Sequence, residues 1–414
     1  MRLISLVKKG RWMLLFPIIV FSITDANGQG FQTAASWNLV EYGNRISALG
    51  QSTAVLNNRV AFHPNPAIPA ENGVITFSSY LISSEPVQTL LPDDPVMYNP
   101  AVSYGARKWS FSAKTDYTRW GSDVELRDEA NNLLGERRAS FDTRILRLNI
   151  SRELFTRLYL GLGISHLKDY YPTLAHTELS PNNDNSASEF MFSAGLYYSD
   201  LYPVSWMLLR PQFGIAVTDI GGALNYNLGS HWMQDNLSKT TPGQLRSNFG
   251  LDIVTQKIIA NQRFAQIGLY FSLNKYMSGL LKSDWDEGFY TGLEMVTSTW
   301  GSFERSDGTG VTTYTLSDQI STSYGIELGL LETIFFQFGS IDGAEMWIRP
   351  HSTFGVTLDF QYVSLSYNRI KYHQSDGWYF DEWSTSGMNI DIRIPVDGSF
   401  QPTILNQIRD WLSD

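Results

Sequence analysis

Apolar side chains recur at every second residue in segment after segment of this 414-residue chain. Residues 158–165 read Leu-Tyr-Leu-Gly-Leu-Gly-Ile-Ser, and the same alternation returns in segments 267–274, 324–330, 354–360 and 388–394. A period of two is that of a β-strand, in which successive side chains point to opposite faces. The pattern therefore predicts an all-β fold whose strands each have one apolar face.

The first 28 residues have the three parts of a secretory signal. Basic residues precede an apolar run over residues 12–23, and small and polar residues follow. Cleavage after Gly28 would leave Gln29 as the new N-terminus, and a cut after Ala26 fits nearly as well. A membrane anchor is the competing interpretation, but such a short apolar run does not span ~30 Å of hydrocarbon. We therefore expect an exported protein with no helical membrane span.

Alternation by itself fits two architectures. A soluble sandwich turns the apolar face inward, whereas a transmembrane barrel turns it outward to lipid. Export, strands of about ten residues and aromatic residues at strand ends all favour the barrel. Short connections at 107–108, 153–155 and 332–333 also alternate with long polar ones, as at the two rims of an outer-membrane barrel.

We expect a transmembrane antiparallel barrel of about fourteen strands in the bacterial outer membrane, with both chain ends on the periplasmic side. The predicted strands cover residues 73–82, 98–107, 108–118, 141–153, 156–168, 189–199, 207–219, 245–256, 264–276, 319–331, 333–340, 352–360, 362–373 and 386–394. The predicted long outer loops are 119–140, 169–188, 220–244, 277–318 and 374–385, and the long connection 341–351 is placed on the opposite rim.

Charge and composition exclude several functions. A net charge of −10 argues against a partner held through nucleic-acid phosphates, and the absence of Cys excludes disulfides, thiolate zinc sites and cysteine nucleophiles. The six His have no zinc-helix spacing, and no Gly-x-Ser-x-Gly elbow occurs. Asp284, Asp286 and Glu287 lack the ligand spacing of a calcium loop. We therefore expect no enzyme, no metal site and no cofactor.

A series of short motifs runs through most of the mature chain. In order, they are Ser47-Ala48-Leu49-Gly50, Asn65-Pro66-Ala67 before the first strand, Leu133-Leu134-Gly135 in an outer loop, Thr218-Asp219-Ile220-Gly221-Gly222, Leu273-Asn274-Lys275 at a strand end, Ser298-Thr299-Trp300-Gly301 and Gly325-Ile326-Glu327. Their order and spacing resemble the PorV outer-membrane proteins of the type IX secretion system, which share a fold with the FadL-type transporters. The chain departs from that pattern at Ile68-Pro69 and in residues 395–414.

Residues 29–72 precede the barrel and carry too many polar groups to lie in lipid, so we expect a plug in the lumen. Its predicted centre is His63, Asn65, Pro66 and Ala67, where prolines fix the backbone and the Asn can bond exposed backbone groups. One interpretation is a rigid turn without a ligand. The other follows from the resemblance, because the equivalent segment of FadL-type relatives gates a lipid path.

The largest predicted loop, 277–318, is far longer than a hairpin closure needs. It carries many aromatic residues that we expect to be exposed, among them Trp285, Phe289, Trp300 and Phe303. Such residues either pack over the barrel mouth or bind a partner protein. Inside the barrel, Glu327, Asp359, Asp391 and Arg393 are expected to form a hydrogen-bonded and ion-paired network.

The resemblance implies a non-enzymatic adaptor that receives the C-terminal signal domain of exported cargo on its outer loops. Its implied partners are secreted cargo proteins, other secretion-system components and outer-membrane lipid, with no nucleic acid. The alternative is passive passage of hydrophobic small molecules through a FadL-like lumen. A continuous apolar path past Asn65-Pro66-Ala67 would favour passage, and a lumen filled by ion pairs would favour the adaptor.

The predicted organisation is a signal peptide over 1–28, a plug over 29–72, a barrel over 73–394 and a tail over 395–414. In the tail, apolar residues recur at helical spacing after Pro402. Residues 402–412 are therefore expected to form a short amphipathic helix docked on the periplasmic rim or on a partner.

Overall fold

A closed antiparallel β-barrel with fourteen strand positions makes up most of the chain. In this computed structural model, the described residues are 45–52, 60–83, 96–127, 133–170, 186–227, 236–259, 262–280, 289–306, 311–344, 350–360, 362–372 and 384–396. The predicted signal peptide, most of the predicted tail and Trp285 lie outside these residues.

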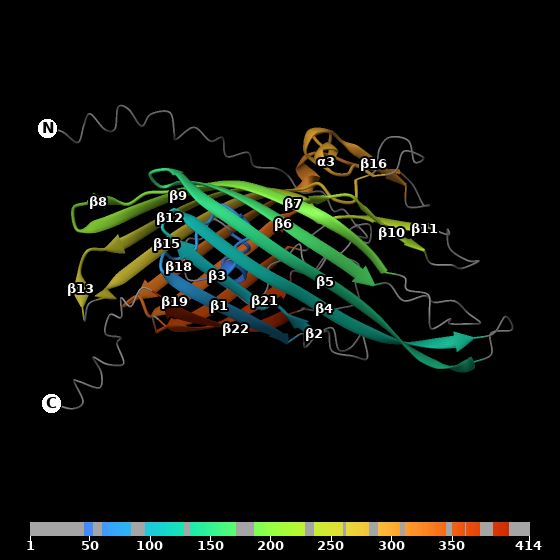
Figure 1. The fold of residues 1–414 in the computed structure, drawn as a ribbon, viewed down its shortest axis with the longest axis horizontal. Helices are drawn as coiled ribbons and strands as arrows, with labels where there is room; N and C mark the ends of the chain where they lie inside the picture. Colours follow the sequence, from blue (N-terminus) through green and yellow to red (C-terminus); the bar gives the residue numbers. More distant parts are fainter. Residues whose placement is uncertain are drawn as a thin grey trace.

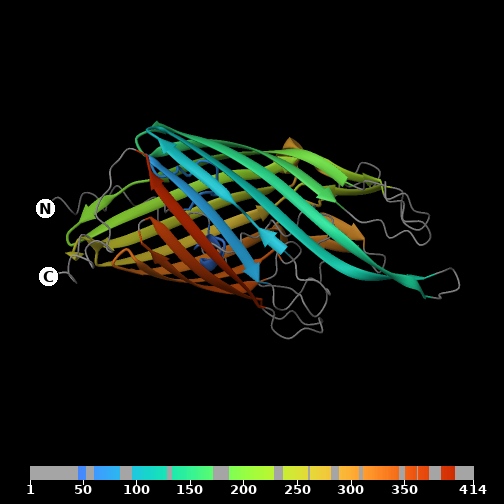
Figure 2. The same cartoon turned by 60° about the horizontal axis from the view of Figure 1, so that its bottom comes forward.

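The barrel strands follow one another around the ring in chain order (Figures 1 and 2). They are β1 (Val74–Ser83), β2 (Val96–Tyr98) and β3 (Ala101–Ala106) sharing one position, β4 (Trp109–Arg127), β5 (Leu133–Phe155), β6 (Leu158–Tyr170), β7 (Ser186–Ser199), β9 (Met207–Gly221), β12 (Gln244–Thr255), β15 (Ala265–Tyr276), β18 (Ile320–Leu330), β19 (Ile334–Gly343), β20 (His351–Asp359), β21 (Val363–Tyr372) and β22 (Ser384–Pro395). β1 pairs with β22 from Val74 opposite Pro395 to Ser83 opposite Ser386, which closes the ring.

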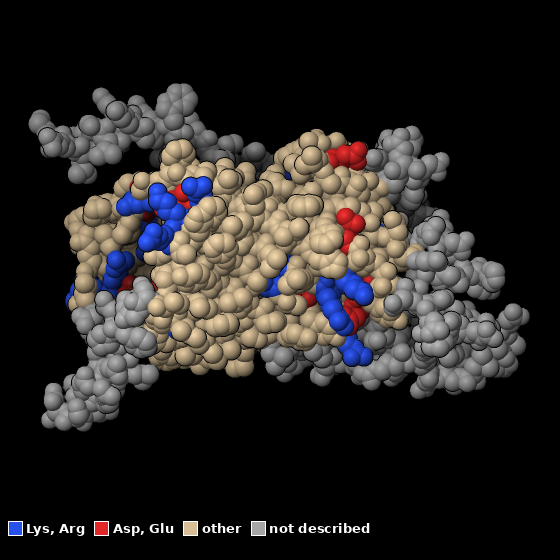
Figure 3. Space-filling model, viewed as in Figure 1, with Lys and Arg blue, Asp and Glu red and all other residues tan. Residues whose placement is uncertain are grey.

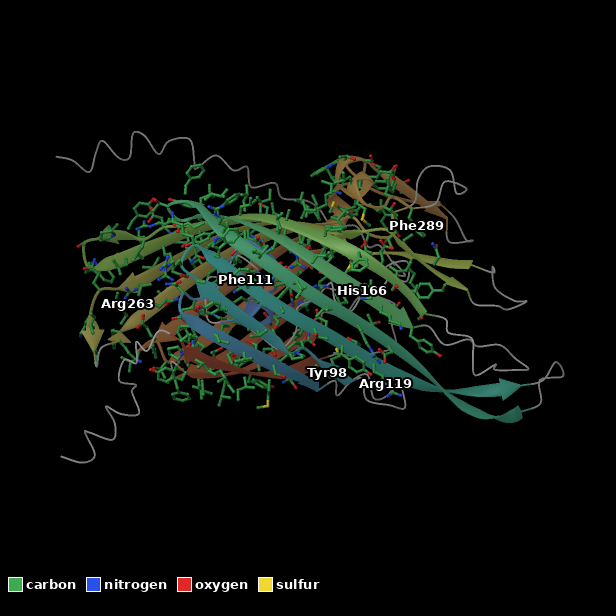
Figure 4. All side chains as sticks on the ribbon, viewed as in Figure 1. Tyr98, Phe111, Arg119, His166, Arg263 and Phe289 are labelled. Atoms are coloured by element: carbon green, nitrogen blue, oxygen red, sulfur yellow. The ribbon has the colours of Figure 1, made fainter. Side chains whose placement is uncertain are left out.

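Smaller elements lie at the two rims. The rim of short turns carries β8 (Tyr202–Val204) and the hairpin β13 (Ile258–Ile259) to β14 (Gln262–Arg263), whose Arg263 is labelled in Figure 4. The rim of long loops carries the hairpin of β10 (Ala223–Asn227) and β11 (Asn236–Thr240), α3 (Leu293–Thr297), the hairpin of β16 (Phe303–Ser306) and β17 (Val311–Tyr314), and η4 (Ser317–Gln319). In the described part of the chain, neither these helices nor α2 (Arg45–Ala48) is long and apolar enough to cross a bilayer.

The predicted fold class is confirmed, and each predicted strand overlaps one barrel position. Two loop predictions are wrong. Residues 119–140 are largely strand, because β4 and β5 stay paired as far as Leu126 opposite Gly135. The pairing of β5 with β6 ends well before that point, at Asp142 opposite Tyr170. A strand can outgrow the bilayer because lipid thickness limits only the part that lies in the membrane. Figure 2 shows this two-stranded ribbon projecting past the barrel.

The other correction concerns the rims. Predicted loop 220–244 is a long outer connection, as expected, and it contains the β10–β11 hairpin. Connection 341–351 joins β19 to β20 on the same rim as loop 277–318, since the chain reverses direction at every strand and β18 to β19 turns at the other rim. All long connections therefore lie on one rim.

The outer wall of the barrel is apolar. Along β6, Leu160, Leu162 and Ile164 are exposed, whereas Gly161 and Ser165 on the alternate face are buried. Figure 3 shows a belt of uncharged surface, with Lys, Arg, Asp and Glu gathered toward its two ends. Exposed aromatic side chains lie at the short-turn rim, including Trp109, Phe155, Tyr202 and Trp206. A closed barrel with this surface crosses a membrane, and its place is the bacterial outer membrane.

Candidate functional site

The segment that contains Asn65, Pro66 and Ala67 lies inside the barrel against β6, β7 and β9. All three residues are buried, as is His63. The Asn65 side chain donates from Nδ2 to the carbonyl oxygen of Leu196 at 3.2 Å and accepts from the backbone N–H of Ala67 at 3.0 Å. The amide of Asn149 donates to the carbonyl oxygen of His63 at 3.3 Å. The segment is thus bonded to the wall through both side chains and backbone.

Three glycines on neighbouring strands let this segment approach the wall. A Cβ on Gly161 would lie 2.2 Å from the carbonyl carbon of Pro66, and one on Gly195 would lie 2.1 Å from Oδ1 of Asn65. On the next strand, a Cβ on Gly214 would lie 3.0 Å from Nδ2 of Asn65. We call Gly161, Gly195 and Gly214 the first seat. Any larger side chain there would push the plug segment away from the wall.

A second seat holds the segment around α2 on the other side of the lumen. Gly325, Gly339 and Gly355 lie on β18, β19 and β20, and a Cβ on Gly339 would lie 2.1 Å from the backbone nitrogen of Gly50. Thr353 donates to the carbonyl oxygen of Ala48 at 2.8 Å and accepts from the N–H of Gly50 at 3.1 Å. Two separate stretches of the predicted plug are therefore fixed to opposite parts of the wall.

An ion pair reinforces the second seat. The Arg45 guanidinium donates from Nε and Nη2 to the two carboxylate oxygens of Glu327, and both side chains are buried. Gln337 also donates to Glu327, at 3.2 Å. Burial is the largest single effect and lowers the pKa of Arg45. The charge of Glu327 and its hydrogen bonds, together with nearby Tyr270 and Asp252, outweigh it, so the net change is upward and the guanidinium stays charged.

Further ion pairs fill the lumen at the level of the seats. Asp116 accepts from Lys114 at 2.9 Å and from Arg147, which also reaches Asp219 at 3.1 Å. Nearer the short-turn rim, Arg393 pairs with Asp359, and Asp391 accepts from Asn389 at 2.9 Å. The acidic and basic residues predicted to face the lumen do form this network. The sequence did not identify Arg45 as a partner of Glu327, because 282 positions separate them.

Toward the long-loop rim the interior becomes apolar. Ile145, Leu167, Met191 and Leu224 are fully buried in one cluster, and the β10–β11 hairpin supplies its inner layer through Leu224 and Tyr226. A second cluster joins Ile220, Met277 and Met295, the last of these on α3. It lies on the outward side of the wall, because Ile220 lies opposite the exposed Phe192. We call the two the outer apolar clusters. Lumenal walls of such barrels are ordinarily polar, so the first cluster, whose members face the lumen, departs from that rule.

The predicted partner-binding aromatics are divided among different environments. Phe289 is half-buried and lies at the long-loop end in Figure 4. The Phe303 ring lies 5.8 Å from that of Tyr290 in an edge-to-face contact. Trp300 is 49% exposed, and its ring lies 4.9 Å from Nζ of the buried Lys275. Of the described residues, Trp300 is therefore the predicted aromatic that offers the most surface.

Comparison with known proteins gives a likeness of fold only. No protein-family model and no curated protein matches the chain. Among solved structures, the chain is similar to the toluene transporter TbuX of Ralstonia pickettii, with 11% identity, a TM-score of 0.47 and coverage of 87% of this chain and 99% of that one. It is also similar to the toluene transporter TodX of Pseudomonas putida, with 10% identity, a TM-score of 0.42 and coverage of 86% and 97%. A FadL homologue of Pseudomonas aeruginosa matches with 10% identity, a TM-score of 0.41 and coverage of 86% and 99%.

Proposed function

We propose that this barrel binds hydrophobic small molecules at its long-loop rim and passes them inward across the outer membrane. The observation that carries the proposal is the first outer apolar cluster. Fully buried Ile145, Met191 and Leu224 line the interior at a level where a barrel wall is ordinarily polar. Apolar lining with a few placed polar groups is the usual chemistry of a small-molecule site.

Loop elements cover both clusters. The β10–β11 hairpin covers the first from the lumenal side, and α3 covers the second on the outward side of the wall. α3 is bonded to the wall through the N–H of Gly292, which donates to the carbonyl oxygen of Gly221 at 2.7 Å. A ligand that replaces the apolar contacts of the hairpin would therefore open the first cluster without exposing its lining to water.

The apolar lining does not continue to the short-turn rim. The pair of Asp116 and Arg147 lies below the first cluster, and Arg147 is two residues nearer the short turn than Ile145 on the same strand. Below that lies the first seat with Asn65. A hydrophobic molecule can then pass toward the short-turn rim only if this ion pair and the first seat rearrange. The Asn65-Pro66-Ala67 segment is therefore the gate of the proposed route.

Whole-cell uptake tests the proposal. Cells that lack their own outer-membrane hydrocarbon transporter and produce the wild-type barrel should accumulate an uncharged aromatic hydrocarbon faster than cells with an empty vector. Leu224→Asn should remove most of that gain, because it places a polar amide in the cluster. Leu293→Asn, at an exposed position of α3, is the matched control. Equal uptake by wild type and empty vector would refute the proposal.

The second candidate is the cargo adaptor that the resemblance implies. The specific observation in its favour is the ion-paired lumen with two seated plug segments, which suits a barrel that acts through its outer surface. The exposed Trp300 and the projecting β4–β5 ribbon would supply that surface. Recovery of exported proteins with the intact chain should exceed recovery with loop 277–318 removed, and equal recovery would refute the adaptor.

A further inference from the structure

Exposed basic side chains gather on the lipid-facing side of three neighbouring strands, toward the long-loop rim (Figure 3). Arg144 on β5 lies opposite Lys168 on β6. Arg119 on β4 is the diagonal neighbour of Arg144, because it lies opposite Asp142. All three cations are exposed, and 63% of the Arg144 side-chain surface is accessible. We call Arg119, Arg144 and Lys168 the basic patch, and Arg119 is labelled in Figure 4.

The height of the basic patch places it among the lipid headgroups. On the same face of β6, the exposed apolar residues Leu160, Leu162 and Ile164 come before Lys168. A strand rises about 3.3 Å per residue, which leaves about 2.5 Å of height at a tilt of about 40°. From Leu158, at the short turn, to Lys168, the strand therefore climbs about 25 Å, the height of the apolar band of such barrels. Lys168 thus stands at the upper edge of that band.

Two tyrosines border the basic patch. Tyr98 on β2 lies opposite Tyr117 on β4, which in turn lies opposite Arg144. The two tyrosine rings are 4.8 Å apart, and the guanidinium carbon of Arg144 lies 5.3 Å from the centre of the Tyr117 ring. Tyrosine is enriched at membrane interfaces, where its ring sits at the level of the headgroups. The aromatic rings and the cations therefore mark the same level of the membrane.

The positive charge of the basic patch is not balanced by the protein. Near this rim, the described residues on the outward face of β4, β5 and β6 include one carboxylate, that of Asp142, which accepts from Nε and Nη2 of Arg144 at 2.9 and 3.0 Å. Arg119 and Lys168 have no ion pair among the described residues. Like charges on facing strands repel each other. Three cations against one carboxylate leave a charge of about +2, and a phosphate monoester carries about −1.5 to −2.

Exposed cations are not spread evenly around the long-loop rim. Near this rim, the outward row of Tyr324 on β18, Ser340 on β19 and Ser352 on β20 carries no charge. Arg369 and Lys371 are exposed on β21, but both lie on one strand, and β22, β1 and the position of β2 and β3 separate them from the basic patch. The basic patch differs because its cations come from three adjacent strands.

We propose that the basic patch binds the phosphate of an anionic outer-leaflet lipid, the phosphorylated lipid A of lipopolysaccharide. Arg144 and Lys168 have Cβ atoms about 4.5–5.5 Å apart, and Arg119 lies about 7–8 Å away on the diagonal, so their long side chains can meet on one phosphate. The donor fork of arginine matches phosphate oxygens. The acyl chains of the same lipid would lie on exposed Leu146 and Phe190, directly below the patch. The site is separate from the proposed hydrocarbon route inside the barrel.

Native mass spectrometry tests the site, with the full chain in detergent titrated with diphosphorylated lipid A. The wild type should bind this lipid, and Arg144→Gln with Lys168→Gln should weaken binding about tenfold, since charge-assisted hydrogen bonds are lost. Arg369→Gln with Lys371→Gln is the matched control, because it also removes one exposed Arg and one exposed Lys from the outward face, and it should leave the affinity unchanged. Equal weakening by the two variants, or none by the first, would overturn the proposal.

Three further arms identify what is bound. Dephosphorylated lipid A, with the same acyl chains, should bind the wild type about tenfold more weakly. Equal binding of the two lipids would mean that acyl chains alone are held, and displacement of lipid A by inorganic phosphate would mean a site for a soluble anion; either result refutes the lipid site. Arg144→Lys with Lys168→Arg keeps both charges and should retain most of the binding, which separates loss of charge from misfolding. These outcomes do not depend on hydrocarbon uptake.

Discussion

Arg45, in the short helix α2, and Glu327, on barrel strand β18, form a buried ion pair that joins the plug to the wall. Replacing Arg45 by Ala leaves the Glu327 carboxylate buried without its cation. Breaking one partner of such a pair costs about 3–5 kcal/mol. We therefore expect Arg45→Ala to lower the free energy of unfolding by that amount in guanidinium titrations of the lipid-reconstituted barrel.

Removing both charges of this pair together is the control. Arg45→Met combined with Glu327→Leu should lie much closer to wild type than either single change, because no charge is then left unpaired. An Arg45→Ala barrel as stable as the wild type would mean that the pair does not hold the plug.

The first seat predicts a strict requirement for glycine at position 195. Gly195→Ala places a Cβ against Asn65, so the Asn65-Pro66-Ala67 segment must move off the wall. Overpacking of this kind costs about 1–3 kcal/mol. The midpoint of unfolding should fall accordingly, while Gly301→Ala, where a Cβ meets nothing within 4 Å, should leave it unchanged. Equal midpoints for the two variants would contradict the seat.

The outer wall predicts a depth-dependent penalty for charge. Ile164 is exposed near the middle of β6, so Ile164→Arg should destabilise the barrel by about 2–4 kcal/mol in lipid vesicles. Leu293→Arg places the same charge at a position on α3 that is 79% exposed, and it should cost almost nothing. The two variants should refold alike only if β6 does not face lipid.

Lys275 fastens the α3 region to the barrel. Its ammonium donates to the hydroxyl of Thr299 at 2.7 Å and lies over the ring of Trp300. A cation–π contact at a half-exposed ring contributes about 0.5–1 kcal/mol. Trp300→Ala should therefore speed amide hydrogen exchange in residues 293–299, as measured by mass spectrometry. Trp109→Ala removes a comparable contact with Arg152 at the opposite rim and should leave that exchange unaffected.

The barrel could be predicted from the sequence because its determinants are local. The alternation from Leu158 to Ile164 fixes both the strand and the face that meets lipid, and each short turn fixes the neighbour of each strand. The same logic failed at β4 and β5, where polar residues in Trp109–Arg127 continue a strand that has already left the membrane.

The lumen could be predicted only in part, because its contacts join distant segments. Asp359 and Arg393 are lumenal by alternation alone, and they do pair. The seats are different. Gly195 and Gly339 occupy ordinary inward-facing positions, and nothing in their own segments shows that Asn65 or Gly50 will lie against them. The first outer apolar cluster was not predicted, for a related reason. Met191 is as apolar as a lipid-facing residue and differs only in that its side chain points into the lumen.

Photocrosslinking with benzophenone, an uncharged aromatic, tests the central claim most directly. Met191 and Phe192 are adjacent, but Met191 is fully buried in the first apolar cluster and Phe192 is 60% exposed on the lipid face. In the lipid-reconstituted protein, we expect crosslinks at both residues, with those at Met191 suppressed by an excess of a non-reactive aromatic hydrocarbon and those at Phe192 little changed. Crosslinks confined to Phe192 and other lipid-facing positions would contradict a hydrophobic site inside this barrel.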